Sequence, residues 1–156
     1  KIARAVNRRV DIVYDYTDGT TQFDEIEDPL PFDITKDPIV INDEDYALFY
    51  RDITEEPKKY AGKTVQFKGQ VARLRSQREG MFAPGRCVMT CCEADITFMG
   101  LPCKFVGSEG LKTRSWVRVT ATVEAKYHSL YKGVGPILTA KTVEPADPAE
   151  QEVATF

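Results

Sequence analysis

Four cysteines and one nearby aspartate are the residues of this 156-residue chain whose types and spacing suit chemistry. Cys87, Cys91 and Cys92 lie close together, Asp95 follows three residues after Cys92, and Cys103 lies further along. Thiolates are good ligands for zinc or copper, and a carboxylate can complete a zinc site. Cys91, Cys92 and Asp95 are therefore the candidate metal or redox site, with zinc as the candidate cofactor.

Two other interpretations of the cysteines stay open. Free cysteine is among the most buried residue types, so all four thiols could be reduced and act as small hydrophobic side chains. Cys87 and Cys103 would be diagonal neighbours in a hairpin, and a disulfide between them would indicate an exported protein. The chain has no C-x-x-C pair, and the adjacent Cys91 and Cys92 are awkward for one tetrahedral ion.

Other catalytic constellations are missing from the sequence. His128 is the single histidine and is expected in a loop, so a Ser-His-Asp triad has no other base to use. The segment Gly107-Ser-Glu-Gly110 lacks the spacing and the Lys-Ser/Thr ending of a phosphate-binding loop. We therefore predict that the protein is not an enzyme.

A basic stretch offers a second candidate site, for an anionic ligand. Its candidate ligand-binding residues are Lys68, Arg73, Arg75, Arg78 and Arg86. On an OB fold such a region often binds oligonucleotides or sugars. Binders of single strands usually add exposed aromatic side chains, whereas Phe67 and Phe82 are expected in the core, so nucleic acid is a disfavoured partner.

The composition is that of a globular protein, with 42% hydrophobic residues and a net charge of −3. The charge is unevenly distributed: residues 1–10 are basic, 11–56 strongly acidic and 57–132 basic. No apolar run approaches the roughly 18 to 20 residues of a membrane-spanning helix. The chain begins at Lys1 rather than Met, so we expect it to be part of a longer protein.

Residues 1–38 are predicted to form an acidic arm with a β-hairpin. Alternating apolar residues predict a strand over 10–16, Thr17-Asp18-Gly19 predicts the turn, and residues 20–26 return. A short buried strand is expected over 39–41. Asn42 is the expected N-cap of a helix whose apolar face carries Tyr46, Phe49, Tyr50 and Ile53.

Residues 39–145 are predicted to form a five-stranded OB-like barrel, so the fold class is mainly β with minor α. The expected strands cover residues 64–71, 81–92, 95–106, 116–127 and 137–143, with a turn over 133–136. A β-sandwich is the alternative. Residues 146–156 are rich in proline and glutamate and are expected to be a disordered tail.

Several runs resemble the C-terminal domain of the bacterial YcgQ-like family, over about residues 39–145. They are Tyr60-Ala-Gly-Lys-Thr-Val-Gln-Phe-Lys-Gly-Gln-Val71, Arg86-Cys-Val-Met-Thr-Cys-Cys-Glu-Ala-Asp95, Gly100-Leu-Pro, Trp116-Val-Arg-Val-Thr-Ala-Thr-Val123 and Pro136-Ile-Leu. The Cys-Cys-x-Ala-Asp element is the most specific of these. Cys87 and Cys103 are not part of the family pattern.

This resemblance implies a soluble domain in a subunit of a two-component membrane permease complex. The domain would act by protein contact or by binding a small ligand or ion, with a permease subunit as its partner. Attachment to the membrane would come from a preceding N-terminal segment. The basic residues of 1–9 favour the cytoplasmic side, a disulfide would favour the other, and we expect an extracytoplasmic domain.

Overall fold

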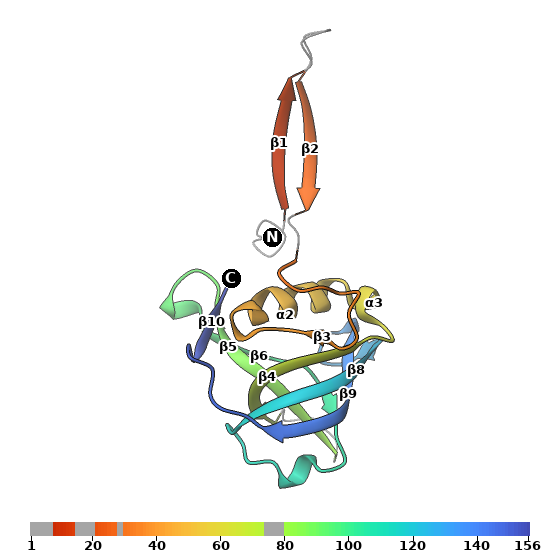
Figure 1. Ribbon diagram of the computed structural model, residues 1–156, viewed down its shortest axis with the longest axis vertical. Coiled ribbons are helices and arrows are strands. Elements are labelled where there is room, and N and C mark those ends of the chain that lie inside the picture. The colour runs from red at the N-terminus through yellow and green to blue at the C-terminus, as the bar shows by residue number, and fades with distance from the viewer. Residues whose placement is uncertain (1–7, 15–20, 28–29, 74–79) are drawn as a thin grey trace. The chain divides into compact units, whose positions relative to one another are not determined.

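The computed structural model describes residues 8–14, 21–27, 30–73 and 80–156 (Figure 1). The chain divides into two units, Lys1–Pro31 and Phe32–Phe156. The fold is mainly β with a few short helices, as the sequence predicts. The boundary falls earlier than the expected residue 38, and Phe32 is already buried in the second unit.

The first unit contains the predicted hairpin. Strands β1 (Arg8–Tyr14) and β2 (Thr21–Glu27) pair antiparallel, with Ile12 opposite Phe23. The predicted Thr17-Asp18-Gly19 turn lies outside the described residues.

The second unit is built around a closed ring of five strands. The members are β4 (Thr64–Ala72), β5 (Met81–Met89), β7 (Cys103–Lys104), β8 (Trp116–His128) and β9 (Gly133–Pro145). Strand β4 pairs antiparallel with β5 and β8, β8 pairs antiparallel with β9, and β9 runs parallel to β7. The antiparallel β5–β7 pair closes the ring.

Alternation of apolar and polar residues decides which side chains fill the ring. Val65, Phe67 and Val71 of β4 are buried, as are Val117, Val119, Ala121 and Val123 of β8. Side chains alternate between the two faces of a strand, so these sets share the inner face. The strands predicted over 64–71 and 116–127 are therefore confirmed, each with one face in the core.

Three short strands extend the sheet beyond the ring. Strand β3 (Ile39–Val40) runs parallel to β4, and β6 (Thr97–Gly100) pairs antiparallel with β5. Strand β10 (Val153–Thr155) runs parallel to β5. The expected disorder of residues 146–156 was therefore wrong for this segment, because Ala149 and Ala154 are buried and small enough to pack closely.

Two other elements differ from the sequence prediction. The expected strand over 95–106 is divided into β6 and β7 around Leu101 and Pro102, because proline has no N–H to offer a strand ladder. The expected turn over 133–136 is part of β9, and the chain reverses over 129–132 instead. The connection after β7 contains a single 3₁₀ turn, η3 (Ser108–Gly110).

Glycines allow β4, β5 and β6 to approach one another closely. A side chain at Gly85 would collide with the backbone of Met99 and Gly100, and one at Gly69 would meet the backbone of Gly85. Gly69 is thus a point of close backbone contact, where no other residue type fits without movement of a strand.

An aromatic helix closes part of the core. A 3₁₀ turn, η1 (Asp43–Asp45), leads into α2 (Tyr46–Glu55), and Asn42 precedes it without making a side-chain capping hydrogen bond. The rings of Tyr46 and Phe49 lie 5.8 and 5.5 Å from that of Phe67. The helix therefore packs on β4 through the apolar face that its spacing predicts.

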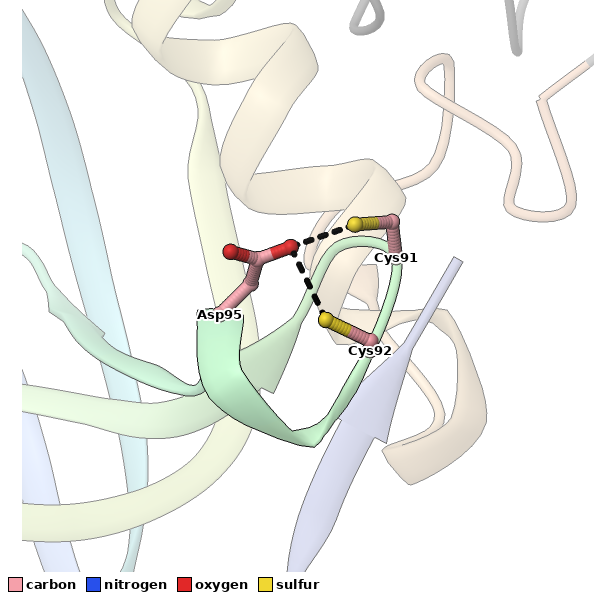
Figure 2. Close-up of side chains that lie close together, drawn as sticks. All are labelled: Cys91, Cys92 and Asp95. Atoms are coloured by element: carbon pink, nitrogen blue, oxygen red, sulfur yellow. Dashed lines mark hydrogen bonds between the residues drawn. The ribbon is translucent and has the colours of Figure 1, made fainter.

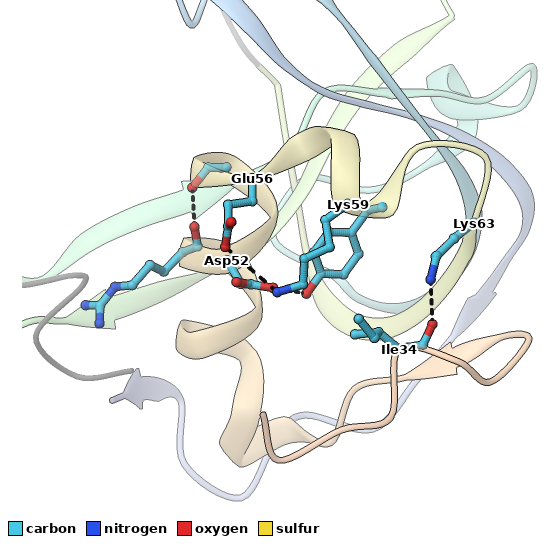
Figure 3. Close-up of polar contacts among 8 residues, drawn as sticks. Ile34, Asp52, Glu56, Lys59 and Lys63 are labelled. Carbon is cyan, nitrogen blue, oxygen red and sulfur yellow. Dashed lines mark hydrogen bonds and ion pairs between the residues drawn. The ribbon is translucent and has the colours of Figure 1, made fainter. Parts of the chain in front are cut away.

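A buried carboxylate joins α2 to the next helix, α3 (Pro57–Tyr60), which begins at a proline, a residue that suits the first helical position. Asp52 is 5% exposed and its Oδ2 accepts a hydrogen bond from the Tyr60 hydroxyl at 2.5 Å. Lys59 Nζ lies 2.8 Å from the same oxygen (Figure 3). Lys63 Nζ donates to the Ile34 carbonyl at 2.9 Å, which fastens the start of the unit to this corner. Among the described residues, no helix is long and apolar enough to cross a membrane.

Candidate metal centre

The turn between β5 and β6 brings the predicted metal-ligand residues together. Cys91 and Cys92 follow β5, and Asp95 ends the 3₁₀ turn η2 (Glu93–Asp95). The Asp95 N–H donates to the Cys92 carbonyl at 2.9 Å, so the backbone folds back on itself. Figure 2 shows both thiols directed toward the Asp95 carboxylate.

The three possible ligand atoms form a compact group. The two Sγ atoms and a carboxylate oxygen of Asp95 all lie within 4.8 Å of one another. Cys91 Sγ donates a short hydrogen bond to Asp95 Oδ2, and Cys92 Sγ lies 3.6 Å from the same oxygen. Both cysteines are exposed and Asp95 is partly exposed, so an ion can reach the group from solvent.

These distances fit a small tetrahedral ion after a modest change. Zn–S bonds of about 2.3 Å and Zn–O bonds of about 2.1 Å place sulfur and oxygen ligands about 3.6 Å apart. The separation between Cys92 and Asp95 already has this value, whereas Cys91 and Asp95 are closer and must move apart. Within the described part of the chain, this group has three members, so a fourth position is left for water or an outside ligand.

The surroundings of Cys91 keep its thiol protonated. Hydrogen bonds to Asp95 and then to Cys92 raise the pKa of the Cys91 thiol to about 11. A metal must therefore displace the proton that Cys91 shares with the carboxylate. It follows that metal binding at this turn will release protons and will become stronger as the pH rises.

The remaining two cysteines are separate from this group. Cys103 is opposite Phe82 in the β5–β7 pair, whereas Cys87 is opposite Phe98 in the β5–β6 pair. Five residues of strand separate the two positions, which is roughly 16 Å. Both are free thiols, so the disulfide considered from the sequence was wrong: the interruption at Pro102 moves Cys103 away along β5. Cys103 is fully buried, which raises the pKa of its thiol to about 12.

The predicted basic residues that the structure describes, Lys68, Arg73 and Arg86, do not form one surface. Lys68 is mostly buried and makes an ion pair with Asp43 at 3.0 Å. Arg73 donates to the carbonyls of Ser108 and Leu111, which fastens the connection after β7. Arg75 and Arg78 lie outside the described residues.

Arg86 is buried rather than directed to solvent. It is 1% exposed, and its Nη1 and Nη2 donate to the carbonyls of Asp43 and Gln151, each at 2.5 Å. Its guanidinium also lies 5.6 Å from the centre of the Trp116 ring. Burial lowers the pKa of the arginine. Arg86 is therefore placed to join three distant segments of the chain, not to meet a ligand.

His128 is the last residue of β8 and stabilises the turn that follows. Its Nδ1 accepts a hydrogen bond from the Leu130 N–H at 3.0 Å, and its ring packs edge-on against Tyr131. One ring nitrogen is thus engaged with the backbone two residues away, and His128 is the last residue of a strand instead of the loop residue that the sequence predicts.

Residues 16–153 match the family model described as the DUF1980 C-terminal domain. The chain belongs to this family. The matched range of the DUF1980 C-terminal domain includes the whole turn with Cys91, Cys92 and Asp95. Among curated proteins, no match to the chain is found.

One basic residue of this DUF1980 domain escaped the sequence analysis. Arg118 on β8 lies directly opposite Lys68 on β4, and both line a groove with Asn42 and Gln66. The alternation of Val117 and Val119 indicates that Arg118 points outward, but only the β4–β8 register reveals its cationic neighbour.

Proposed function

We propose that this domain binds a thiophilic divalent cation, zinc first, through Cys91, Cys92 and Asp95. The observation that carries the proposal is the convergence of two exposed thiols and a carboxylate within 4.8 Å. Two thiolates and a carboxylate form a ligand set that zinc accepts, whereas hard cations such as Mg²⁺ prefer oxygen ligands. Because the fourth coordination position is open to an outside ligand, the site suits an ion that is bound and then transferred to another protein.

The broader role we propose is that of a non-enzymatic accessory domain in a membrane permease complex. Support comes from the resemblance of the Cys-Cys-x-Ala-Asp element and its flanking strands to the YcgQ-like family. The domain would be held at the membrane by a preceding segment, on the extracytoplasmic side. In that setting the exposed turn would bind the ion and present it to the permease subunit.

We also propose that the five-stranded ring is an OB-like barrel. Around the ring the strands follow the order β4, β5, β7, β9 and β8, and β8 pairs again with β4. The third and fifth strands of the ring in chain order, β7 and β9, run parallel. This arrangement supports an OB-like scaffold, in which loops between strands carry the binding site. The thiol turn is such a loop, between the second strand and the first half of the third.

Cobalt substitution tests the metal site directly. We expect Co²⁺ added to the reduced protein to give the intense ultraviolet absorption of thiolate-to-cobalt charge transfer, and Zn²⁺ to abolish it. Cys91→Ser and Cys92→Ser should each lose most of the band, and Asp95→Asn should weaken binding while keeping thiolate absorption. Cys87→Ser is the matched control, because Cys87 is also partly accessible but lies outside the group.

Two results would contradict the proposal. Absence of metal binding in the reduced wild-type protein would remove the site. Equal loss of binding in the Cys87 and Cys91 variants would show that the turn is not the ligand set. The permease context has a separate test: recovery of the full-length protein in the soluble fraction without a membrane partner would count against it.

A further inference from the structure

Exposed apolar side chains cluster at the tip of the β8–β9 hairpin. Six large hydrophobic residues are exposed in the described part of the chain, and Tyr127, Leu130 and Val134 are three of them. Tyr127 is 71% exposed and lies directly opposite Val134, while Leu130 lies in the turn between them. Single exposed hydrophobic residues need no explanation, but a cluster of this kind indicates a contact surface.

The tip extends beyond the neighbouring strands. The pairing of β8 with β4 ends at Thr122, and β9 pairs with β7 at Leu138 and Thr139. Among the described residues, the end of the hairpin past these points has no further strand beside it. Helices α2 and α3 also contact the hairpin, so the part of the tip that is free to meet another surface is the part with the exposed Tyr127, Leu130 and Val134.

The shape of the tip is fixed in advance. The Tyr131 ring lies against Gly135, where a side chain would collide with it, and the Tyr131 hydroxyl donates to the Pro136 carbonyl at 2.9 Å. His128 Nδ1 accepts from the Leu130 N–H, which holds the turn. Because these contacts already exist, docking through the tip costs little conformational entropy.

The tip is also basic in a protein of net negative charge. Residues 125–135, which form the tip, include Lys126 and Lys132 and contain no aspartate or glutamate, although the chain carries a net charge of −3. Lys126 is paired with Glu124 at 2.8 Å, whereas Lys132 is exposed at the end of the turn. This local excess of positive charge is complementary to an anionic surface.

We infer that the β8–β9 hairpin tip docks on an anionic lipid bilayer. Tyrosine favours the level of the lipid headgroups, aliphatic side chains enter the acyl boundary, and lysines attract anionic headgroups. Three side chains are too few to form a specific protein interface, which buries about 800 Å² on each partner. They suffice for a shallow membrane contact that electrostatic attraction strengthens.

Vesicle sedimentation of the metal-free chain tests this inference independently of the thiol site. We expect binding to vesicles of equal parts phosphatidylglycerol and phosphatidylcholine, weaker binding to phosphatidylcholine alone, and loss of binding as salt rises. The double variant Tyr127→Ser/Leu130→Ser should lower the partition coefficient about tenfold or more, because it removes the inserted apolar area. Val106→Ser is the matched control, because Val106 is fully exposed elsewhere.

Charge is tested with Lys132→Asn. Lys132 has a φ of 52°, and asparagine tolerates this left-handed conformation, so the turn keeps its shape. We expect a several-fold loss of binding to anionic vesicles, and no comparable loss for Lys112→Gln, which removes an exposed charge elsewhere. Thermal unfolding of each variant checks that the fold is intact.

Three outcomes would overturn the inference. One is failure of the wild-type chain to bind anionic vesicles at low salt. Another is binding that the tip variants leave unchanged but that Arg4→Gln/Arg8→Gln/Arg9→Gln abolishes, since the basic start of the chain would then be responsible. The third is tip-dependent binding to nucleic acid or an acidic protein with none to vesicles.

Discussion

Replacement of Arg86 by methionine tests whether a buried cation holds the second unit together. The guanidinium donates to two backbone carbonyls, at Asp43 and Gln151, which belong to segments far apart in sequence. Methionine has a similar length and no charge, so it can fill the space but cannot reach either carbonyl with a donor.

The size of the effect follows from these two bonds. A hydrogen bond from a charged group contributes about 1.5–3 kcal/mol, so the pair contributes about 3–6 kcal/mol. Relief from burying a charge offsets part of this, since Arg86 is 1% exposed and its Nε has no partner. We expect a net loss of about 2–4 kcal/mol in the free energy of unfolding, equivalent to about 8–16 °C in melting temperature.

Urea unfolding followed by tryptophan fluorescence is the appropriate assay. Trp116 is the only tryptophan, and its ring lies 5.6 Å from the Arg86 guanidinium, so the signal reports on this part of the core. Hydrogen exchange should also show faster opening of β10 than of β4, because the Gln151 carbonyl that precedes β10 loses its donor.

Arg118→Met is the control for this experiment, since Arg118 is an exposed arginine on the outer face of β8. Its stability should stay within about 0.5 kcal/mol of the wild type. If Arg86→Met is as stable as this control, or more stable than the wild type, the cost of burying the charge exceeds the contribution of its hydrogen bonds and the reasoning is refuted.

Three further outcomes follow from other sites. Zinc affinity should rise at least tenfold per pH unit between about pH 6 and pH 8. The reason is that the Cys91 thiol, with its pKa raised to about 11, stays protonated in this range and must lose a proton to bind. Titration calorimetry measures the affinity, and an affinity that does not change with pH would exclude Cys91 as a ligand. Gly85→Ala should lower the free energy of unfolding by about 2–3 kcal/mol in urea unfolding, because the added methyl group would collide with the backbone of β6. An unchanged free energy of unfolding would mean that β6 can move aside without cost. Tyr60→Phe should cost about 1–2 kcal/mol by the same assay, because buried Asp52 loses a donor; an unchanged stability would mean that Lys59 alone satisfies the carboxylate.

Local patterns predicted the strands and the helix face well. Alternation predicted the strands β4 and β8, whose Val65, Phe67 and Val119 are buried, because one face of each strand must be apolar. The thiol turn was also accessible from the sequence, because Cys91, Cys92 and Asp95 are so close in the chain that one turn brings them together. Metal binding there stays a prediction.

Features that depend on register were not accessible. Cys103 was expected as a diagonal neighbour of Cys87, but it is opposite Phe82, because the break at Pro102 shifts the pairing. Arg86 was assigned to a surface, since arginine is rarely buried without a partner. Its partners are carbonyl groups, which every residue carries, so no sequence pattern marks them. The pairing of β10 was missed for the same reason.

Strand β5 has more neighbours than any other described strand, and this bears on how the chain is synthesised. It pairs with β4, β6, β7 and β10, and the last of these follows β5 by more than sixty residues, at Val153–Thr155. While a ribosome is still making β9 and β10, β5 and β7 expose edges that have no partner yet. Unpaired edges are where nascent chains associate wrongly, so the interval before β10 emerges is when this domain most needs protection by chaperones.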